Sequence, residues 1–562
     1  MKTLFIMAVV YCIISFLAAI CIASGHMTFK LSDNCSYVIS VSDTPWLVSG
    51  PTYFRGDNVT YSTVDGSLKQ SGPPTATNGS DILGPYKKVV HTWKAGQQEV
   101  HTAVRYYNNV QAVVFSQNSQ QNTIDWGVMG EVDNLPSGYQ YDTVVYYSDK
   151  GINMAMEKWG KALRKWYGRS TSAQEMDSSI NYIGYYTDNG IYIQHDSMAS
   201  CWSQQILTFW DYLLGGAKQW GLVVYEQDWL NYQVEKFSPL HKDVSLGRRW
   251  LHQMGEAAKR FDMQIQYCMA LPRHLMASLE VPVVSQVRAS IDYQLLKNQW
   301  NIGITSLFAH AMGVAPFKDN LWTKCIQPGN VYNKTEPYPL LQLIVALLST
   351  GPVGIGDRVG YTDAKLVNSC RSVAILFANK AKHLHTSLKP LIFGDDFGPD
   401  GEVWSTYSDI SGIKFGIIFC PIIRKDYLLK PKDIGIPDVQ YAVYSYTFHI
   451  MYDHVAPFDS KHPLMLHNCT NDNVCMYYAS PIIMIRSKPL IILGEMSKLV
   501  PMSPCRVRSL TYDTADVSIV IVGKPGEVID FYFIYGDLHQ HTHCIITGSG
   551  RATISWSKQV CY

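Results

Sequence analysis

The sequence has almost no net charge, because 47 lysines and arginines oppose 46 aspartates and glutamates. It also lacks a run of basic residues, which argues against nucleic acid as a partner. The CxxC and HExxH spacings of common zinc sites are absent, so neither a metal site nor another cofactor is predicted. No internal repeat or low-complexity tract is present. What remains is a globular chain of 562 residues, 47% hydrophobic, whose length predicts about three domains.

The N-terminus has the pattern of a targeting segment. Lys2 precedes an apolar run from Leu4 to Ala23, followed by small residues. Residues 1–24 are therefore predicted to be a signal peptide cleaved near Ala23, or an uncleaved anchor, since the run is nearly long enough to span a bilayer. Membrane association is expected only for the anchor. In both cases we expect a secreted protein or one in the lumen of the secretory or lysosomal route.

Acceptor sequons and cysteines agree with this route. N-glycosylation sequons occur at five positions: Asn34, Asn58, Asn78, Asn333 and Asn468. Of 13 cysteines, two lie in the targeting segment. Close spacing predicts disulfides between Cys469 and Cys475 and between Cys544 and Cys561. The odd remainder leaves at least one thiol unpaired, and Cys268, in an apolar strand, is the candidate.

Hydrophobic periodicity divides the rest of the chain into four parts. Residues 26–150 alternate with period two and predict an N-terminal β-sandwich. Residues 151–180 contain an amphipathic linker helix. Residues 181–384 repeat strand, loop and helix, which predicts a (β/α)8-type barrel or an incomplete version of one. Residues 385–562 return to strands alone and predict a C-terminal β-domain. No oligomeric state is indicated.

Six strands are expected in the barrel part, and aspartates follow four of them. The expected strands are residues 182–187, 222–225, 263–269, 283–287, 302–309 and 352–355. The aspartates are Asp188, Asp228, Asp292 and Asp357. A single such aspartate often caps the next helix. Four at the carboxyl ends of parallel strands, where active sites of barrels lie, favour a binding or catalytic site.

Three segments resemble the raffinose synthase and α-galactosidase group of glycoside hydrolases. Residues 184–190 (Gly-Tyr-Tyr-Thr-Asp-Asn-Gly) resemble its first barrel strand. Residues 288–293 (Arg-Ala-Ser-Ile-Asp-Tyr) are similar to its Arg-x-Ser-Asp-Asp-Phe/Tyr signature. Residues 351–360 are similar to its Gly-Pro-Val-x-x-Ser-Asp-Lys-Pro-Gly stretch. The resemblance covers roughly residues 181–380.

The resemblance implies roles for individual residues. Asp228 matches the nucleophile, and Asp292 matches the acid/base, with Arg288 four positions ahead of it. A retaining mechanism places two such carboxyl groups about 5–5.5 Å apart, and Arg288 close to Asp228 would favour its charged form. Further candidates for contact with a sugar are Asp188, Tyr186, Glu226, Trp229, Arg273, His274 and Asp357. Lys318 and Asp319, after another expected strand, are weaker candidates for the same pocket.

The sequence departs from the group in two places. Ile291 stands where the signature has its first aspartate. Between Asp188 and Asp228 we expect one helix and no strand, whereas the group has its second and third barrel strands there. The preferred hypothesis is a secreted retaining α-glycosidase, either a hydrolase or a transglycosylase, that acts on α-galactoside-like sugars. The alternatives are a catalytically impaired glycan-binding protein on a degenerate glycosidase fold, and a structural secreted protein that uses its β-domains.

Overall fold

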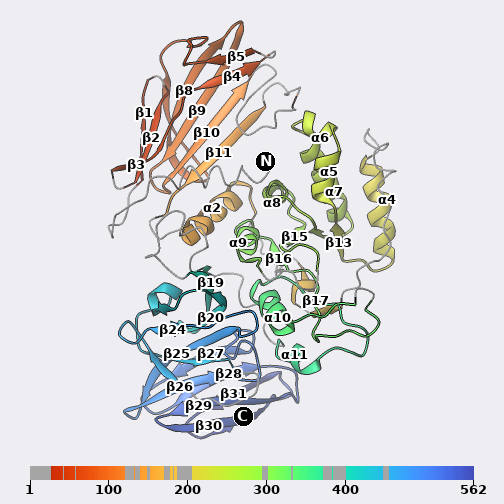
Figure 1. Cartoon of the computed structure of the whole chain (residues 1–562), viewed down its shortest axis with the longest axis vertical. Helices are drawn as coiled ribbons and strands as arrows, with labels where there is room; N and C mark the ends of the chain where they lie inside the picture. Colours follow the sequence, from red (N-terminus) through yellow and green to blue (C-terminus); the bar gives the residue numbers. More distant parts are fainter. Residues whose placement is uncertain are drawn as a thin grey trace. The chain divides into compact units, whose positions relative to one another are not determined.

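The computed structural model of the chain divides into two compact units, and Figure 1 labels their helices and strands. The first unit comprises residues 1–171, 194–284 and 311–313, and the second comprises residues 172–193, 285–310 and 314–562. The residues that the structure describes are 27–33, 35–41, 43–56, 59–119, 132, 139–148, 152–169, 177–181, 183–185, 206–293, 301–330, 333–370, 382–383, 400–446 and 455–562.

The predicted targeting segment, residues 1–24, lies outside the described residues. Within the described ranges, none of the helices has both the length and the apolar character that a membrane span requires.

The N-terminal part of the first unit consists of antiparallel strands. One sheet has the order β1-β2-β3, and another has the order β11-β10-β9-β8-β6 with β7 also on β8. Met27 and Ile39 of the first sheet share a buried cluster with Val104 and Val113 of the second, so the two sheets pack against each other. The strand bounds are β1 Met27–Leu31, β2 Tyr37–Val41, β3 Thr44–Val48, β4 Tyr53–Gly56, β5 Val59–Ser62, β6 Leu68–Gln70, β7 Thr75–Asp81, β8 Gly84–Ala95, β9 Gln98–Tyr107, β10 Ala112–Ser119 and β11 Gln140–Tyr146.

Helix α2 (Ile152–Trp166) follows these strands, in the range where the linker helix was predicted. Its Trp166 packs against the cluster around Tyr107, and the Arg105 guanidinium lies 5.0 Å from the Trp166 ring centre. A Cβ atom added at Gly160 would lie 2.3 Å from the Ala311 carbonyl oxygen. Glycine at this position therefore allows the close approach of the two backbones.

The remainder of the first unit alternates helices with two parallel strands. Its elements are α4 Ile206–Gln219, β13 Val224–Gln227, α5 Leu230–Lys236, α6 Pro239–Lys242, α7 Leu246–Arg260, β14 Gln264–Tyr267 and α8 Pro272–Ala277. Strands β13 and β14 pair in parallel, from Val224 opposite Gln264 to Gln227 opposite Tyr267. Helix α7 buries Trp250 and Met254 on one face, as its helical spacing predicts, and the Trp250 ring lies 6.0 Å from that of Trp210 on α4.

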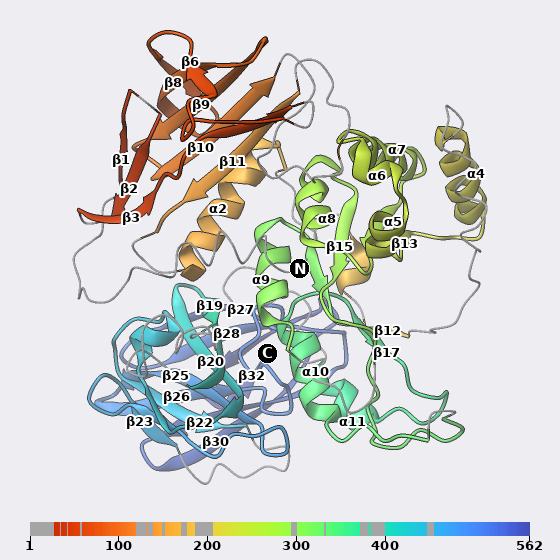
Figure 2. The same cartoon turned by 45° about the horizontal axis from the view of Figure 1, so that its top comes forward.

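The second unit contains further parallel strands, and its first and last ones are neighbours. Their elements are β12 Ile183–Tyr185, β15 Val284–Arg288, α9 Gly303–Ala311, β16 Ala315–Phe317, α10 Pro339–Leu348, β17 Val353–Ile355 and α11 Ala364–Asn368. Strands β15 and β16 pair in parallel, and Leu321, just after β16, forms a parallel bridge to Ile355 of β17. Strand β17 in turn pairs in parallel with β12, which lies beside it in Figure 2.

This order places the first expected barrel strand next to the last, as a closed ring of parallel strands requires. Residues 186–205, where the sequence pattern lacks two strands, lie outside the described residues. The complete barrel therefore stays a prediction, and the described fold is mixed α/β with parallel strand pairs.

One of the six expected strands is wrong. Residues 302–309 were predicted as a strand, but helix α9 begins at Gly303, and the strand is β16. The apolar and β-branched residues of this stretch favour a strand, which is why the helix was not predicted. In the helix, Thr305 Oγ1 donates to the Ile302 carbonyl oxygen, 2.8 Å away. A Cβ atom at Gly303 would lie 1.8 Å from the Trp404 ring, so glycine is needed where α9 meets that tryptophan.

The C-terminal part of the second unit is built from two large antiparallel sheets and the antiparallel pair β21-β24. A nine-stranded sheet has the order β18-β19-β20-β25-β26-β29-β30, with β22 on β25 and β23 on β22, and a four-stranded sheet has the order β27-β28-β31-β32. Phe531 and Phe533 of the larger sheet share a core with Ile519 and Ile521 of the smaller one. The strand bounds are β18 Lys382–His383, β19 Gly401–Ile410, β20 Ile413–Ile423, β21 Tyr427–Leu429, β22 Tyr441–Ser445, β23 Ala456–Phe458, β24 Leu464–Leu466, β25 Cys475–Ile485, β26 Lys488–Gly494, β27 Val507–Tyr512, β28 Val517–Val522, β29 Val528–Tyr535, β30 Leu538–Ile545, β31 Arg551–Ser555 and β32 Val560–Cys561.

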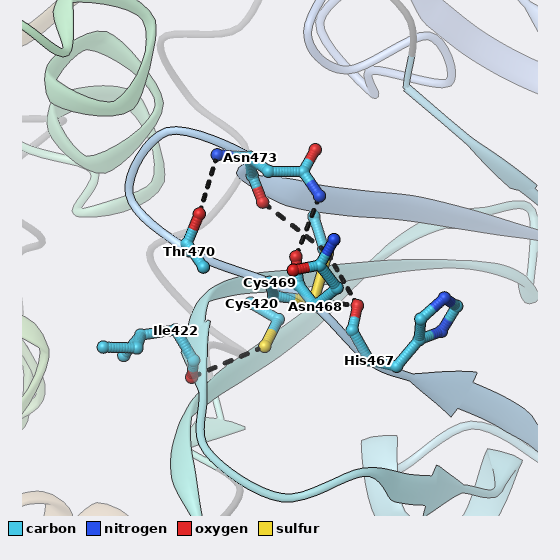
Figure 3. The surroundings of a disulfide bond; sticks show 8 residues. Cys420, Ile422, His467, Asn468, Cys469, Thr470 and Asn473 are labelled. Atoms are coloured by element: carbon cyan, nitrogen blue, oxygen red, sulfur yellow. Dashed lines mark hydrogen bonds between the residues drawn. A yellow bond between two sulfur atoms is a disulfide. The ribbon is translucent and has the colours of Figure 1, made fainter.

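Both predicted disulfides are confirmed. Cys544–Cys561 joins β30 of the larger sheet to β32 of the smaller sheet. Cys469–Cys475 closes the loop before β25, and Figure 3 shows the Asn473 side-chain amide donating to the Asn468 carbonyl oxygen, 2.8 Å away, within that loop. Cys268 is buried, and among the described residues it takes part in no disulfide.

A buried ion network lies beside the core of the two sheets. The Arg506 side chain is 2% exposed, and its guanidinium lies 2.8 Å from Glu495 and 2.6 Å from Glu527. Burial raises the pKa of Glu495, and the charge of Arg506 opposes that rise. The guanidinium compensates the buried charge of Glu495, so the stability of this region depends on Arg506.

Candidate functional site

In the first unit, the candidate nucleophile Asp228 directly follows strand β13. Its Oδ1 accepts a hydrogen bond from the Trp229 backbone N–H, 2.7 Å away. Trp229 has a φ of 61° and a ψ of 25°, in the left-handed region, and helix α5 begins at the next residue. A bulky residue in this region costs about 1–2 kcal/mol, and such strain is concentrated at functional sites. The backbone thus turns sharply at the position where the carboxylate is presented.

The residues just before Asp228 form a polar chain along β13. The Tyr225 hydroxyl donates to Gln227 Oε1 at 3.2 Å, and Gln227 Nε2 donates to the Asp228 carbonyl oxygen at 2.9 Å. The pKa of Tyr225 is raised, mainly by burial and further by the negative charges of Asp228 and Glu226. Both carboxylates are therefore close enough to act electrostatically on the same phenol.

Arg273 and His274 lie at the start of helix α8. His274 is 4% exposed, and its Nδ1 accepts a hydrogen bond from the Leu271 backbone N–H at 2.9 Å. Burial, with the positive charge of Arg273, lowers the pKa of His274 to about 3. The ring is therefore neutral and caps the helix, whereas Arg273 is exposed.

In the second unit, Arg288 at the end of β15 contacts two carboxylates. Its guanidinium lies 2.7 Å from Asp292 Oδ1 and 3.7 Å from Asp319 Oδ2. The Arg288 and Asp319 side chains are 7% and 6% exposed, whereas that of Asp292 is 49% exposed. Asp292, the candidate acid/base, is thus the member of this group that a molecule from solvent can reach.

Asp319 holds the loop that carries Asp292. Its Oδ2 accepts from the Tyr293 backbone N–H at 2.6 Å, and its backbone N–H donates to Ser290 Oγ at 3.1 Å. Together with the contact to Arg288, these bonds fix the chain on both sides of Asp292. Burial raises the pKa of Asp319, and the charge of Arg288 opposes this rise.

Lys318 and Tyr293 extend the group into the interior. Lys318 is fully buried; its Nζ lies 3.4 Å from the Asn320 carbonyl oxygen, 3.5 Å from that of Asp319 and 5.2 Å from the Tyr293 ring centre. Burial lowers the pKa of Lys318 to about 8, although Asp319 and Glu336 oppose this effect. The Tyr293 hydroxyl donates to Glu336 Oε2 at 2.5 Å. A buried cation with a displaced pKa beside carboxylates is typical of functional sites.

Asp357, predicted to bind substrate, is engaged by a neighbouring loop. It is 1% exposed, and its Oδ1 accepts from the Thr323 backbone N–H at 2.8 Å and from Gln327 Nε2 at 2.7 Å. The Thr323 hydroxyl donates to Oδ2. These bonds tie β17 to the segment after Leu321, and a contact of Asp357 with substrate stays a prediction.

The structure brings Arg288, Asp292 and Asp319 together. Asp228 belongs to the first unit and Asp292 to the second, so the predicted separation of their carboxyl groups stays a prediction. Tyr186 and Asp188 lie outside the described residues. Lys318 and Asp319, which the sequence offered only as weaker candidates, directly follow strand β16, and Asp319 contacts Arg288.

Among the predicted sequons, Asn34 and Asn58 also lie outside the described residues. Asn78, Asn333 and Asn468 are exposed. Exposure is required for a glycan at these positions, and glycosylation itself stays a prediction.

Comparisons with known proteins give structural likenesses only. No family model and no curated protein matches the sequence. A solved structure of the GH36 alpha-galactosidase AgaA from Geobacillus stearothermophilus, in complex with stachyose, has a TM-score of 0.43 and 7% identity, over 81% of this chain and 91% of that chain. The alpha-galactosidase from Lactobacillus brevis has a TM-score of 0.37 and 8% identity, over 82% and 97%. Likenesses with such low TM-scores establish neither the fold nor the function.

Proposed function

We propose that this chain is a retaining glycoside hydrolase or transglycosylase of the secretory route that acts on α-galactoside-like sugars. The observation that carries the proposal is the ion pair of Arg288 with the accessible Asp292, at the carboxyl end of β15. This pair comes from the motif that resembles the glycosidase signature. It lies where parallel-strand enzymes place their catalytic groups.

In the proposed mechanism, Asp228 attacks the anomeric carbon while Asp292 protonates the departing glycosidic oxygen, which leaves with its bond electrons. A covalent glycosyl ester on Asp228 results. Asp292, now a carboxylate, then removes a proton from water or from a sugar hydroxyl, whose oxygen displaces Asp228. The ion pair with Arg288 holds Asp292 as a carboxylate, so before the first step Asp292 must take up a proton from solvent and its Oδ1 must leave the guanidinium. Asp319, the second carboxylate beside Arg288, then keeps the guanidinium in place.

Two further features support the proposed setting. The two disulfides fit an oxidising compartment, in agreement with the targeting segment and the sequons. The half-buried Trp229 and the exposed Tyr232, whose rings lie 4.9 Å apart after β13, offer the apolar surface on which sugar rings stack.

The experiment is the hydrolysis of an aryl α-galactoside by the full chain and by Asp228→Asn. Loss of turnover in the variant is expected, together with labelling of Asp228 in the wild-type chain by an α-galactoside analogue that forms a stable ester, located by peptide mass spectrometry. The matched control is Asp211→Asn. Asp211 lies on α4 and forms a surface ion pair with Arg260 at the end of α7, so this variant should keep full activity. Turnover that survives Asp228→Asn, or sugar binding without turnover in the wild-type chain, would overturn the proposal.

A further inference from the structure

Three histidines occupy alternate positions of strand β30 in the C-terminal part of the second unit (Figure 1). His539, His541 and His543 are exposed, whereas the intervening Thr542 and the following Cys544 are buried. Successive side chains of a strand point to opposite faces, so residues two apart share a face. The three imidazoles therefore lie in a row on the solvent side of β30, about 7 Å apart at their Cα atoms.

The neighbouring strand β29 already orients two of these rings. His543 lies opposite Asp530, and its Nδ1 is 2.9 Å from Asp530 Oδ1. His541 lies opposite Tyr532 and stacks on its ring, with 5.8 Å between the ring centres. Because a carboxylate accepts hydrogen bonds, Asp530 holds the proton of the neutral ring on Nδ1. This leaves the lone pair on Nε2 free to bind a metal. Histidine ligands in metal sites are commonly oriented in this way, by a carboxylate that bonds to the other ring nitrogen and does not touch the metal.

We propose that His541 and His543 bind one divalent transition-metal ion of the zinc, nickel and copper class on this face. Two imidazoles spaced i and i+2 on a strand reach a common ion at the nitrogen–metal distance of about 2.0–2.1 Å. Within the described residues, no three or more His, Cys, Asp or Glu side chains form a ready-made metal centre. The ion is accordingly held by the histidine pair, and water completes its coordination.

The ligand type sets the expected selectivity. Imidazole nitrogen suits zinc, copper and nickel, whereas magnesium and calcium prefer oxygen ligands. Asp530 acts through His543 and orients it; it is a positioning residue for the site. The site lies away from every residue of the proposed glycosidase mechanism along the chain, and the inference does not depend on that proposal.

The chain contains a matched control for an ordinary exposed histidine. His462 has a carboxylate partner at a similar distance, Asp459 at 3.0 Å from Nδ1, and a similar side-chain exposure, 57% against 59% for His543. It differs in having no histidine two positions away. If metal binding is lost in His541→Ala but not in His462→Ala, the binding depends on the histidine pair and is not a property of any exposed imidazole.

The test is a calorimetric titration of the full chain, purified without a histidine tag, with zinc chloride and then with nickel chloride. We expect one ion per chain, loss of that binding in His541→Ala, no change in His462→Ala, and about 10–100-fold weaker binding in Asp530→Asn. All substituted side chains are exposed, and equal thermal unfolding midpoints without metal will verify that the variants fold. Absence of binding in the wild-type chain, unchanged binding in His541→Ala, or calcium binding of equal strength would overturn the inference.

Discussion

Replacement of the buried Lys318 by methionine is predicted to stabilise the protein at neutral pH. In the folded protein the pKa of Lys318 is lowered to about 8 from its ordinary value of 10.5, with burial as the main cause. At about 1.4 kcal/mol for each pH unit, this difference corresponds to an unfavourable charge of about 3 kcal/mol below pH 8. Methionine retains the apolar stem and fills the same space without a charge.

The substitution also removes favourable contacts. The two carbonyl oxygens lie 3.4 and 3.5 Å from Nζ, so these hydrogen bonds are long. With the Tyr293 ring contact, their loss costs about 1–2 kcal/mol. The net gain at pH 7 is then about 1–2 kcal/mol, which raises the unfolding midpoint by a few degrees.

The stability gained by Lys318→Met depends on pH, because it depends on whether the lysine is charged. Below about pH 8 the lysine is charged in both states and the folded state bears the full penalty, whereas above about pH 10.5 it is neutral in both and the penalty is absent. The advantage of Lys318→Met should therefore fall between about pH 8 and 10.5. Scanning fluorimetry across this range will measure it, with Lys324→Met, at an exposed position of the same segment, as the control. A lower midpoint for Lys318→Met at pH 7, or an advantage that does not change with pH, would refute the reasoning.

Three further substitutions probe the site and the core. Asp319→Asn should lower kcat for an aryl α-galactoside about 10–100-fold with little change in KM, since Arg288 loses its second carboxylate and a buried donor is left unpaired, at about 1–3 kcal/mol. Arg506→Ala should lower stability by about 3–5 kcal/mol, because Glu495 then remains buried without its main partner; calorimetry will show a reduced unfolding midpoint. Asp357→Asn should lower stability by about 1–3 kcal/mol, measured the same way, because its new amide group faces other donors.

A rise in KM at constant kcat in Asp319→Asn would contradict the proposed role of Asp319. The control for Arg506→Ala is Arg424→Ala, which removes an exposed ion pair with Asp400 and should lower the free energy of unfolding by less than about 1 kcal/mol. If the two variants lose the same stability, burial does not determine the effect of Arg506. For Asp357→Asn, an unchanged unfolding midpoint with a raised KM would show that the carboxylate serves the substrate.

Local patterns in the sequence predicted the local features of the fold. The short separation of Cys469 from Cys475 sufficed to predict their disulfide, and the helical spacing of Trp250 and Met254 sufficed for one face of α7. The strand expected at residues 302–309 failed because a short apolar stretch suits either a buried helix or a strand. In the folded chain its Gly303 lies against the Trp404 ring, about 100 positions away, and no local pattern contains such a contact.

The same distinction applies to the candidate site. The apolar run at residues 283–287 predicted that Arg288 and Asp292 follow a strand, and they form an ion pair there. The importance of Asp319 could not be predicted, because its partners Ser290 and Tyr293 lie on another strand-end loop. Likewise, the alternation of His539, His541 and His543 alone does not indicate a metal site. The pairing of β29 with β30, which places Asp530 opposite His543, is needed as well.

The parallel pairing of β12 with β17 has a consequence for biosynthesis. Between Tyr185 and Val353, the ribosome adds about 170 residues, which takes roughly 10–30 s at ordinary elongation rates. Throughout that time the nascent β12 has no β17 to pair with, and an exposed strand edge is prone to pair with other chains. Chains that terminate before Val353 should therefore aggregate or require a chaperone, however well their N-terminal strands have formed.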